Sequence, residues 1–146
     1  MLKGISPRLD SAILTMLNDM GHGDRLIITD THFPAFSTHH NVANASGSSV
    51  NELLEAILPL FELDEYIKDS VIMMSPVQGD THDPQLIDSY ANILNPHFPK
   101  GQKIHFVDRF KFYDISRQSY GIIISSDTRK YANIILTKGV TPSVQG

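Results

Sequence analysis

Apolar side chains recur at helical spacing in three stretches of the chain. In residues 9–20 they return every three or four positions. The second stretch opens at Ser49, whose spacing to Glu52 is that of a capping box, and Pro59 should kink or end it. Residues 84–94 form the third stretch, which a proline opens. The pattern therefore predicts three helices.

Other short stretches are apolar as well, and most of them are apolar at every position rather than at alternate ones. They are residues 26–28, 71–74, 104–107, 120–125 and 133–137. Strands of this kind are typical of a parallel sheet that is covered on both faces. Because they alternate with helices, the sequence predicts an α/β fold: a single compact domain over residues 1–146, with a largely parallel central sheet flanked by helices. Ligands of such sheets gather at the carboxyl ends of the strands.

Composition removes several classes of function. The net charge is −4, and acidic and basic residues are interspersed, so binding to nucleic acid or to an anionic membrane is not expected. The chain has no cysteine, which excludes disulfides, thiolate zinc sites and a cysteine nucleophile. Because a P-loop, a dinucleotide-binding glycine fingerprint and a nucleophile elbow are all missing, nucleotide, hydride and acyl chemistry are not expected either.

The expected cellular location follows from the lack of a signal-peptide pattern and of a membrane-spanning apolar run. The start, Met1 to Pro7, lacks the apolar core of a signal peptide. No later apolar run is long enough to span a bilayer. We therefore expect a cytoplasmic protein.

A histidine between two glycines follows the first predicted helix, in Gly21-His22-Gly23. Glycine lets the backbone take unusual angles, which would leave the imidazole exposed. Histidine suits proton transfer in either direction, because the free side chain titrates near neutral pH. The same residues also fit a helix end capped by glycine, with an ordinary surface histidine.

Four further polar residues stand next to apolar runs. Asp30 closes the first run, and Arg109 follows the third together with aromatic residues. Tyr131 and Asn133 lie at the start of the last run, where a phenol and an amide can bind hydroxyl groups. Each has an ordinary alternative: Asp30 and the Tyr131-Ala132-Asn133 segment also suit turns, and Arg109 also suits a surface ion pair.

A metal site is the alternative use of the acidic and histidine residues. Imidazole and carboxylate suit zinc, iron or manganese, and a metal-dependent hydrolase would draw on Asp30, His32, Asp80 and His82. These residues lack any recognised ligand spacing, so solvated loop positions are favoured over metal ligands. No metal and no cofactor are therefore expected.

Several ordered segments, taken together, resemble one protein family, the RbsD/FucU family of sugar mutarotases and pyranases. The segments are Met20-Gly21-His22-Gly23-Asp24, Thr29 to Pro34, Pro59 to Asp64, Gly79-Asp80-Thr81, Arg109 to Tyr113, Lys130 to Leu136 and Lys138 to Pro142. The resemblance covers nearly the whole chain. Within the family, the Pro-Leu-Phe-Glu-Leu-Asp and Arg-Phe-Lys-Phe-Tyr segments look more like the fucose mutarotase branch, which implies L-fucose as substrate, with D-ribose behind it.

The resemblance implies roles for the residues singled out above. The family's catalytic histidine falls on His22, and its sugar-binding positions fall on Asp30, Arg109, Tyr131 and Asn133. The resemblance also implies a ring-shaped homo-oligomer, a decamer or octamer, in which a neighbouring subunit helps to close each sugar pocket. Two departures stand out. Relatives often have glycine where this chain has Ala132, and the His39-His40 loop has no expected counterpart, so its role stays open.

Mutarotation requires only proton movement, which fits the lack of cofactor motifs. One group donates a proton to the ring oxygen while another removes the anomeric hydroxyl proton. We expect His22 to move the proton, Asp30 to bind hydroxyls and assist as base, and Arg109 to stabilise the developing charge on oxygen. The alternatives are a D-ribose pyranase and a sugar-binding or regulatory module without turnover.

Overall fold

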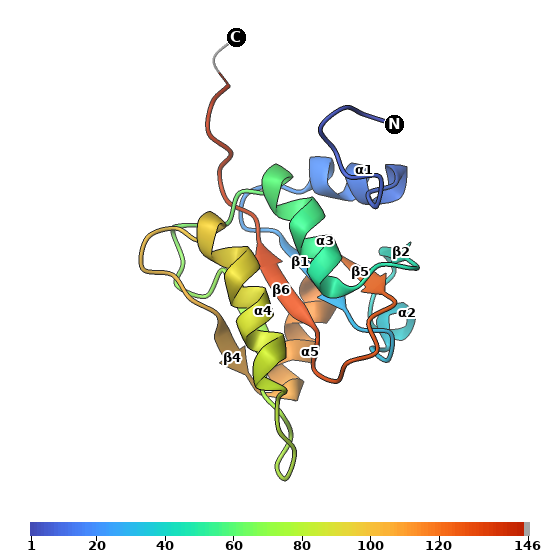
Figure 1. The fold of residues 1–146 in the computed structure, drawn as a ribbon, viewed down its shortest axis with the longest axis vertical. Helices are drawn as coiled ribbons and strands as arrows, with labels where there is room; N and C mark the ends of the chain where they lie inside the picture. The colour runs from blue at the N-terminus through green and yellow to red at the C-terminus, as the bar shows by residue number, and fades with distance from the viewer. Residues whose placement is uncertain (145–146) are drawn as a thin grey trace.

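A single six-stranded sheet organises the chain. The computed structural model describes residues 1–144. The strands are β1 (Arg25–Thr29), β2 (Val42–Ala45), β3 (Val71–Met74), β4 (His105–Val107), β5 (Gly121–Ser125) and β6 (Ile134–Thr137). The helices are α1 (Ser11–Asp19), α2 (Ala35–Thr38), α3 (Val50–Ile57), α4 (Pro84–Leu94) and α5 (Arg109–Gln118), with 3₁₀ turns η1 (Leu58–Leu60) and η2 (Asn95–His97). Helices α3 and α4 cover one face of the sheet and α5 covers the other (Figure 1).

The sheet is mixed but mostly parallel, with strand order β2-β5-β1-β6-β3-β4. Only β6 runs against its neighbours β1 and β3, while every other pairing is parallel. The prediction of an α/β fold with a largely parallel sheet is confirmed. The direction of β6 was not predicted, and it matters because the residues before β6 share an edge of the sheet with the residues after β1, β3 and β4.

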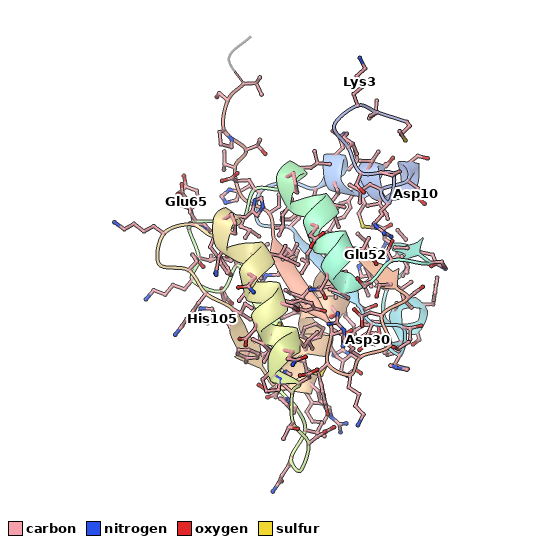
Figure 2. The ribbon with its side chains drawn as sticks, viewed as in Figure 1. Lys3, Asp10, Asp30, Glu52, Glu65 and His105 are labelled. Atoms are coloured by element: carbon pink, nitrogen blue, oxygen red, sulfur yellow. The ribbon has the colours of Figure 1, made fainter. Side chains whose placement is uncertain are left out.

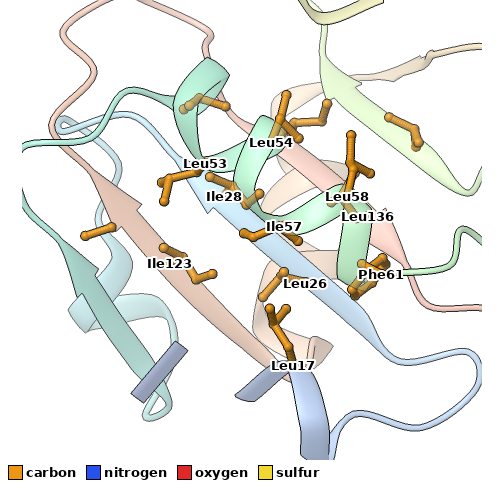
Figure 3. Packing of buried hydrophobic residues seen from close by; sticks show 14 of the residues in the cluster. Leu17, Leu26, Ile28, Leu53, Leu54, Ile57, Leu58, Phe61, Ile123 and Leu136 are labelled. Atoms are coloured by element: carbon orange, nitrogen blue, oxygen red, sulfur yellow. The ribbon is translucent and has the colours of Figure 1, made fainter. Parts of the chain in front are cut away.

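Two apolar layers lie on the two faces of the sheet. Successive side chains of a strand point to opposite faces, so Leu26 and Ile28 join one layer and Ile27 joins the other. In the first layer, the buried leucines and isoleucines of α3 pack over β1 (Figure 3). Each fully buried side chain of this size contributes about 1.5–3 kcal/mol relative to leaving it exposed. Both faces are covered, and this explains why the strands are uniformly apolar.

The predicted helix signals are confirmed at their starts and ends. The Ser49 hydroxyl accepts from the Glu52 amide at 3.1 Å, while the Glu52 carboxylate accepts from the Ser49 amide at 3.0 Å. Pro59 lies in η1, which ends the regular α-helix as expected. The elements α2, β2 and α5 were not predicted. Helix α5 had a readable start signal, because the Asp108 side chain accepts from the Lys111 amide at 2.8 Å.

No helix within residues 1–144 is long and apolar enough to cross a membrane.

Candidate active site

Four of the five predicted site residues lie at one edge of the sheet. Asp30 follows β1 and Arg109 opens the helix after β4, at the carboxyl ends of these strands. Tyr131 and Asn133 precede β6, and because β6 is antiparallel its start lies at this same edge. A site at the carboxyl ends of parallel strands is where α/β sheets bind ligands. The fifth residue, His22, precedes β1 and therefore lies at the opposite edge.

Asp30 is a buried carboxylate that is only partly satisfied. Its Oδ1 accepts from the backbone amides of His32 and Phe33, each at 2.9 Å. Among the residues that the structure describes, none hydrogen-bonds its Oδ2. Burial raises the pKa of Asp30, and the amides of His32 and Phe33 oppose that rise without cancelling it. The free oxygen is therefore an acceptor for a ligand hydroxyl, and the raised pKa suits a group that exchanges protons.

Asn133 is locked to Asp30. Its Oδ1 accepts from the Asp30 backbone amide at 2.8 Å, and the residue is buried. This bond turns the amide so that Nδ2 is left to donate. One short contact therefore sets a hydrogen-bond acceptor and a hydrogen-bond donor side by side, which is the pairing that a diol requires.

The segment before β6 takes an unusual backbone conformation at Tyr131. Tyr131 has φ of +59°, whereas Ala132 does not lie in the left-handed region. Alanine therefore causes no strain at this position, where the resemblance led us to expect glycine. The Tyr131 hydroxyl donates to Asp80 Oδ2 at 2.9 Å, and Lys130 Nζ lies 3.6 Å from the same oxygen. The amide of Thr81, followed by the Tyr131 hydroxyl, lowers the pKa of Asp80.

A hollow of about 350 Å³ opens at this edge, and Asp30, Tyr131 and Asn133 line it. Its apolar wall includes Phe33 and Tyr113, whose rings stack with centroids 5.2 Å apart. A few polar groups beside an aromatic surface are typical of small-molecule sites. The sequence predicted an aromatic surface from the residues after Arg109, at the same end of the sheet as Asp30, and Tyr113 supplies it. Phe33 was not predicted as part of this wall, although it stands three residues after Asp30.

Arg109 lies in an adjoining hollow of about 500 Å³, which it lines with Val77 and Phe110. Its guanidinium sits 4.9 Å from the centre of the Phe110 ring. It does not line the hollow of Asp30, so a single copy does not place Arg109 in the same hollow as Asp30, Tyr131 and Asn133. Within residues 1–144 the guanidinium has no ion pair.

His22 lies away from this group, at the other end of β1. The five residues of β1 rise by about 3.3 Å each, so roughly 15 Å of strand separates the His22 loop from Asp30. There its Nε2 lies 3.1 Å from Asp64 Oδ1, and about half of the imidazole is exposed. Figure 2 shows Glu65, which follows Asp64, well apart from Asp30. One copy of the chain does not bring His22 to the hollow.

The residues of the metal alternative do not converge. Asp80 is engaged by Tyr131, and the His82 ring lies 2.8 Å from the Met74 carbonyl through Nε2. Within the described part of the chain, no group of three or more histidine, aspartate or glutamate side chains is arranged to hold a metal ion.

In the His39-His40 loop, His39 has a structural role. His39 is buried, and its Nδ1 accepts from the Asn41 amide at 2.9 Å. Its Nε2 therefore carries the proton and donates to the Ser119 carbonyl at 2.7 Å. His39 ties the start of β2 to the end of α5, and it lies away from the hollow.

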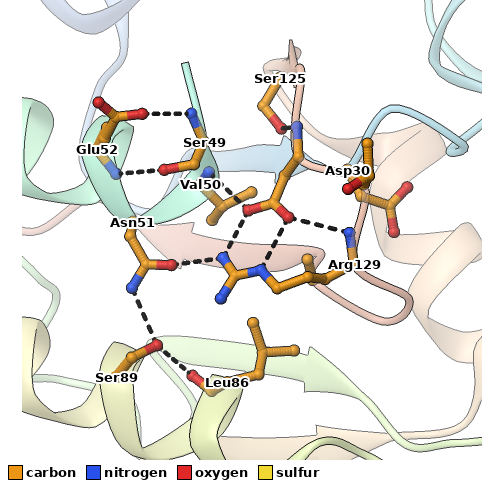
Figure 4. A network of polar contacts seen from close by, with 12 residues as sticks. Asp30, Ser49, Val50, Asn51, Glu52, Leu86, Ser89, Ser125 and Arg129 are labelled. Carbon is orange, nitrogen blue, oxygen red and sulfur yellow. Dashed lines mark hydrogen bonds and ion pairs between the residues drawn. The ribbon is translucent and has the colours of Figure 1, made fainter. Parts of the chain in front are cut away.

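An ion pair between a half-buried arginine and a buried carboxylate holds the loop that carries Tyr131 in place. Arg129 contacts the Asp127 carboxylate at 2.6 Å and also donates to Asn51 of α3 (Figure 4). The Asp127 carbonyl accepts from the Thr31 amide at 2.8 Å, which connects the ion pair to the segment after Asp30. Burial opposes ionisation of Asp127, but hydrogen bonds from Arg129 and from the Val50 amide outweigh it and lower the pKa.

We expect Arg129→Ala to lower the free energy of unfolding by about 2 kcal/mol, because it leaves the Asp127 carboxylate buried without its partner. The effect stays below that of a fully buried pair, since the arginine is over a third exposed. Urea denaturation measures it. The control is Arg117→Ala, which breaks an exposed pair and should cost about 0.5 kcal/mol or less. Equal losses in the two variants would contradict this role of the ion pair.

The fold and the hollow together define an α/β protein with a small-molecule site at the carboxyl edge of its sheet. The chain belongs to the RbsD / FucU transport protein family, which it matches over residues 3–141. It is 46% identical to the L-fucose mutarotase of Histophilus somni strain 2336 over 142 residues, which are 97% of this chain and 99% of that protein.

Solved structures give the same result. The fucose mutarotase of Streptococcus pneumoniae in complex with L-fucose superposes with a TM-score of 0.91 at 34% identity, covering 97% of this chain and 100% of that one. FucU from Bifidobacterium longum also has a TM-score of 0.91, at 38% identity, and covers 96% and 100% of the two chains. The predicted family is therefore confirmed.

Proposed function

We propose that this chain is an L-fucose mutarotase, an isomerase that interconverts the α and β anomers of the free sugar. The observation that carries the proposal is similarity over the full length to an L-fucose mutarotase, combined with a hollow whose polar groups suit a polyol. No reaction step requires redox or phosphate chemistry. D-ribose is the second substrate to test, because ribose pyranases form the other branch of the family that the sequence resembles.

The sugar is held by Asp30 and Asn133 in this proposal. The free Oδ2 of Asp30 accepts from one hydroxyl, and Nδ2 of Asn133 donates to the next. Tyr131 contributes its phenol once the hydroxyl turns from Asp80 to the ligand. The stacked rings of Phe33 and Tyr113 face the apolar side of the sugar. Arg109, with no ion pair among residues 1–144, turns from the adjoining hollow toward the oxygen that gains charge.

His22 reaches the sugar from a second copy of the chain. It lies about 15 Å of strand away from its own Asp30, which is too far for proton transfer within one copy. An assembly that packs the His22 edge of one copy against the hollow of the next completes the set. This agrees with the expected ring of eight or ten subunits, which stays a prediction, as does the cytoplasmic location.

Ring opening then needs two proton transfers. His22 of the neighbouring copy protonates the ring oxygen while Asp30 takes the anomeric hydroxyl proton, and the C1–C2 bond turns before the ring closes with the protons reversed. A positioned acid and base each contribute about 10²–10⁴-fold. The uncatalysed exchange of anomers already proceeds on a laboratory timescale, so an acceleration of this size is sufficient.

Exchange NMR of L-fucose and of D-ribose, with and without protein, tests the function. We expect faster anomer interconversion for L-fucose than for D-ribose. Acceleration of D-ribose alone would make the chain a pyranase. Binding of either sugar without faster exchange would make it a sugar-binding module.

A further inference from the structure

We propose that Asp64 is a positioning residue that holds the imidazole of His22 for proton transfer. The inference rests on the proposed function of the chain and names a residue that this function does not yet include. Asp64 belongs to the Pro59–Asp64 segment, far from His22 in sequence, and no pattern in the sequence pairs the two.

The His22 loop by itself does not fix the ring. His22 stands between Gly21 and Gly23, and Gly23 has φ of +89°, so the backbone alone leaves the imidazole exposed. Two side chains hold it. Asp64 Oδ1 lies 3.1 Å from Nε2, and the Tyr66 ring lies 5.4 Å from the imidazole between centroids, tilted by 52°. Of the residues that the structure describes, Asp64 alone hydrogen-bonds a ring nitrogen of His22.

Asp64 is itself rigid, which a positioning group requires. Its side chain is 4% exposed, its amide donates to the Thr137 carbonyl at 3.0 Å, and Oδ1 accepts from the Tyr66 amide at 3.1 Å. Gly139 allows this placement, because a Cβ there would come within 2.8 Å of the Asp64 Cα. The close approach brings the segment against the end of β6.

The loop of His22 is tied to the same strand end. The Gly23 amide donates to the Lys138 carbonyl at 2.8 Å, and the Lys138 amide donates to the Asp24 carbonyl at 2.9 Å. Lys138 Nζ also donates to the carbonyls of Leu17 and Met20, each at 2.7 Å, which secures the end of α1. Histidine and carboxylate are therefore set relative to each other within one copy, before a second copy docks.

The pairing has a chemical consequence. With Nε2–H donating to the carboxylate, Nδ1 is the nitrogen that faces outward and exchanges a proton with the sugar. In the donor form the ring also carries a proton on Nδ1, and Asp64 stabilises this cation until Nδ1 gives the proton to the sugar's ring oxygen and again when the proton returns as the ring closes. Two charged groups of the same loops are otherwise engaged: Asp24 accepts from the Gly21 amide at 2.7 Å, and Lys138 Nζ donates to the Leu17 carbonyl at 2.7 Å. A general base held by a third group recurs in many enzymes.

The test compares Asp64→Asn with Asp69→Asn. Asparagine keeps the acceptor for the Tyr66 amide but removes the charge, so we expect kcat for sugar exchange to fall by about 10–100-fold while KM changes by less than about twofold. Asp69 lies at the same edge of the sheet and, among residues 1–144, its side chain pairs only with Arg25, at 3.4 Å, so its variant should retain the wild-type rate. A wild-type kcat in Asp64→Asn, or an equal loss in Asp69→Asn, would overturn the inference.

A second measurement does not depend on turnover. Nuclear Overhauser contacts between the His22 and Tyr66 rings should be present in the wild type and lost in Asp64→Ala. Retained contacts would overturn the inference whether or not any sugar reacts. Lost contacts in a protein that accelerates no sugar would support the positioning and refute the proposed function alone.

Discussion

Co-expressed in equal amounts, His22→Ala and Asp30→Asn should recover about a quarter of the wild-type exchange rate, although each variant alone loses at least about 100-fold. The two residues lie at opposite edges of one copy, so in the proposed assembly each site takes Asp30 from one chain and His22 from the next. Random assembly then gives each site both intact residues in about one case of four. Exchange NMR of L-fucose on the purified mixture measures the recovery.

The control pairs His22→Ala with His22→Gln, which offers no intact histidine and should recover nothing. Recovery in that control would trace the activity to something other than His22. A mixture of His22→Ala and Asp30→Asn that stays as slow as its components, in assemblies shown to contain both chains, would place the site within one copy and refute the shared arrangement.

Asp30→Asn and Asp127→Asn should change stability in opposite directions. The two carboxylates are neighbours and both are buried, but the pKa of Asp30 is raised above its ordinary value of 3.8 and that of Asp127 is lowered below it. At pH 7 the charge on Asp30 therefore opposes folding, and the charge on Asp127 supports it. We expect Tm to rise for Asp30→Asn and to fall for Asp127→Asn.

The pH dependence follows from the same signs. The stability that Asp127 contributes is fully present above pH 3.8 and is lost as pH falls through its lower folded-state pKa. The penalty from Asp30 sets in as pH rises from 3.8 through its raised folded-state pKa. Scanning calorimetry at pH 7, at pH 4 and at a pH well below 3.8 measures both effects. An Asp30→Asn protein that is less stable than the wild type would refute the assignment of an unfavourable charge to Asp30.

Sugar exchange should fall by at least about 100-fold in Asp30→Asn, because the variant loses the base of the proposed mechanism.

Much of the fold was readable because its signals are local. Ser49 and Glu52 mark a helix start within four residues, and runs such as residues 71–74 are apolar throughout because the sheet is covered on both faces. The direction of β6 was not readable, since an apolar run of four residues carries no sign of its orientation. Helix α5 was missed because Phe110 is exposed while Phe112 is buried, which blurs its apolar face.

The candidate site was readable residue by residue but not as an arrangement. Asp30, Tyr131 and Asn133 come together through the antiparallel placement of β6, which depends on contacts between residues about a hundred positions apart. The contact between His22 and Asp64 also joins distant parts of the sequence, 42 positions apart. Local pattern carries no information on such pairs, and the site of one copy is incomplete without the histidine of another in the proposed function.

Strand β6 gives the proposed assembly a spacer of fixed length. Its start holds Asn133 against Asp30, and just past its end Lys138 and Gly139 hold the loops of His22 and Asp64. The four residues between span about 13 Å and are buried. Within one copy, the hollow of Asp30 and the His22 that the neighbouring copy uses are therefore held at a constant distance and rotation by β6. A residue inserted into β6 would alter the rotation from one subunit to the next, and with it the number of subunits that closes the ring.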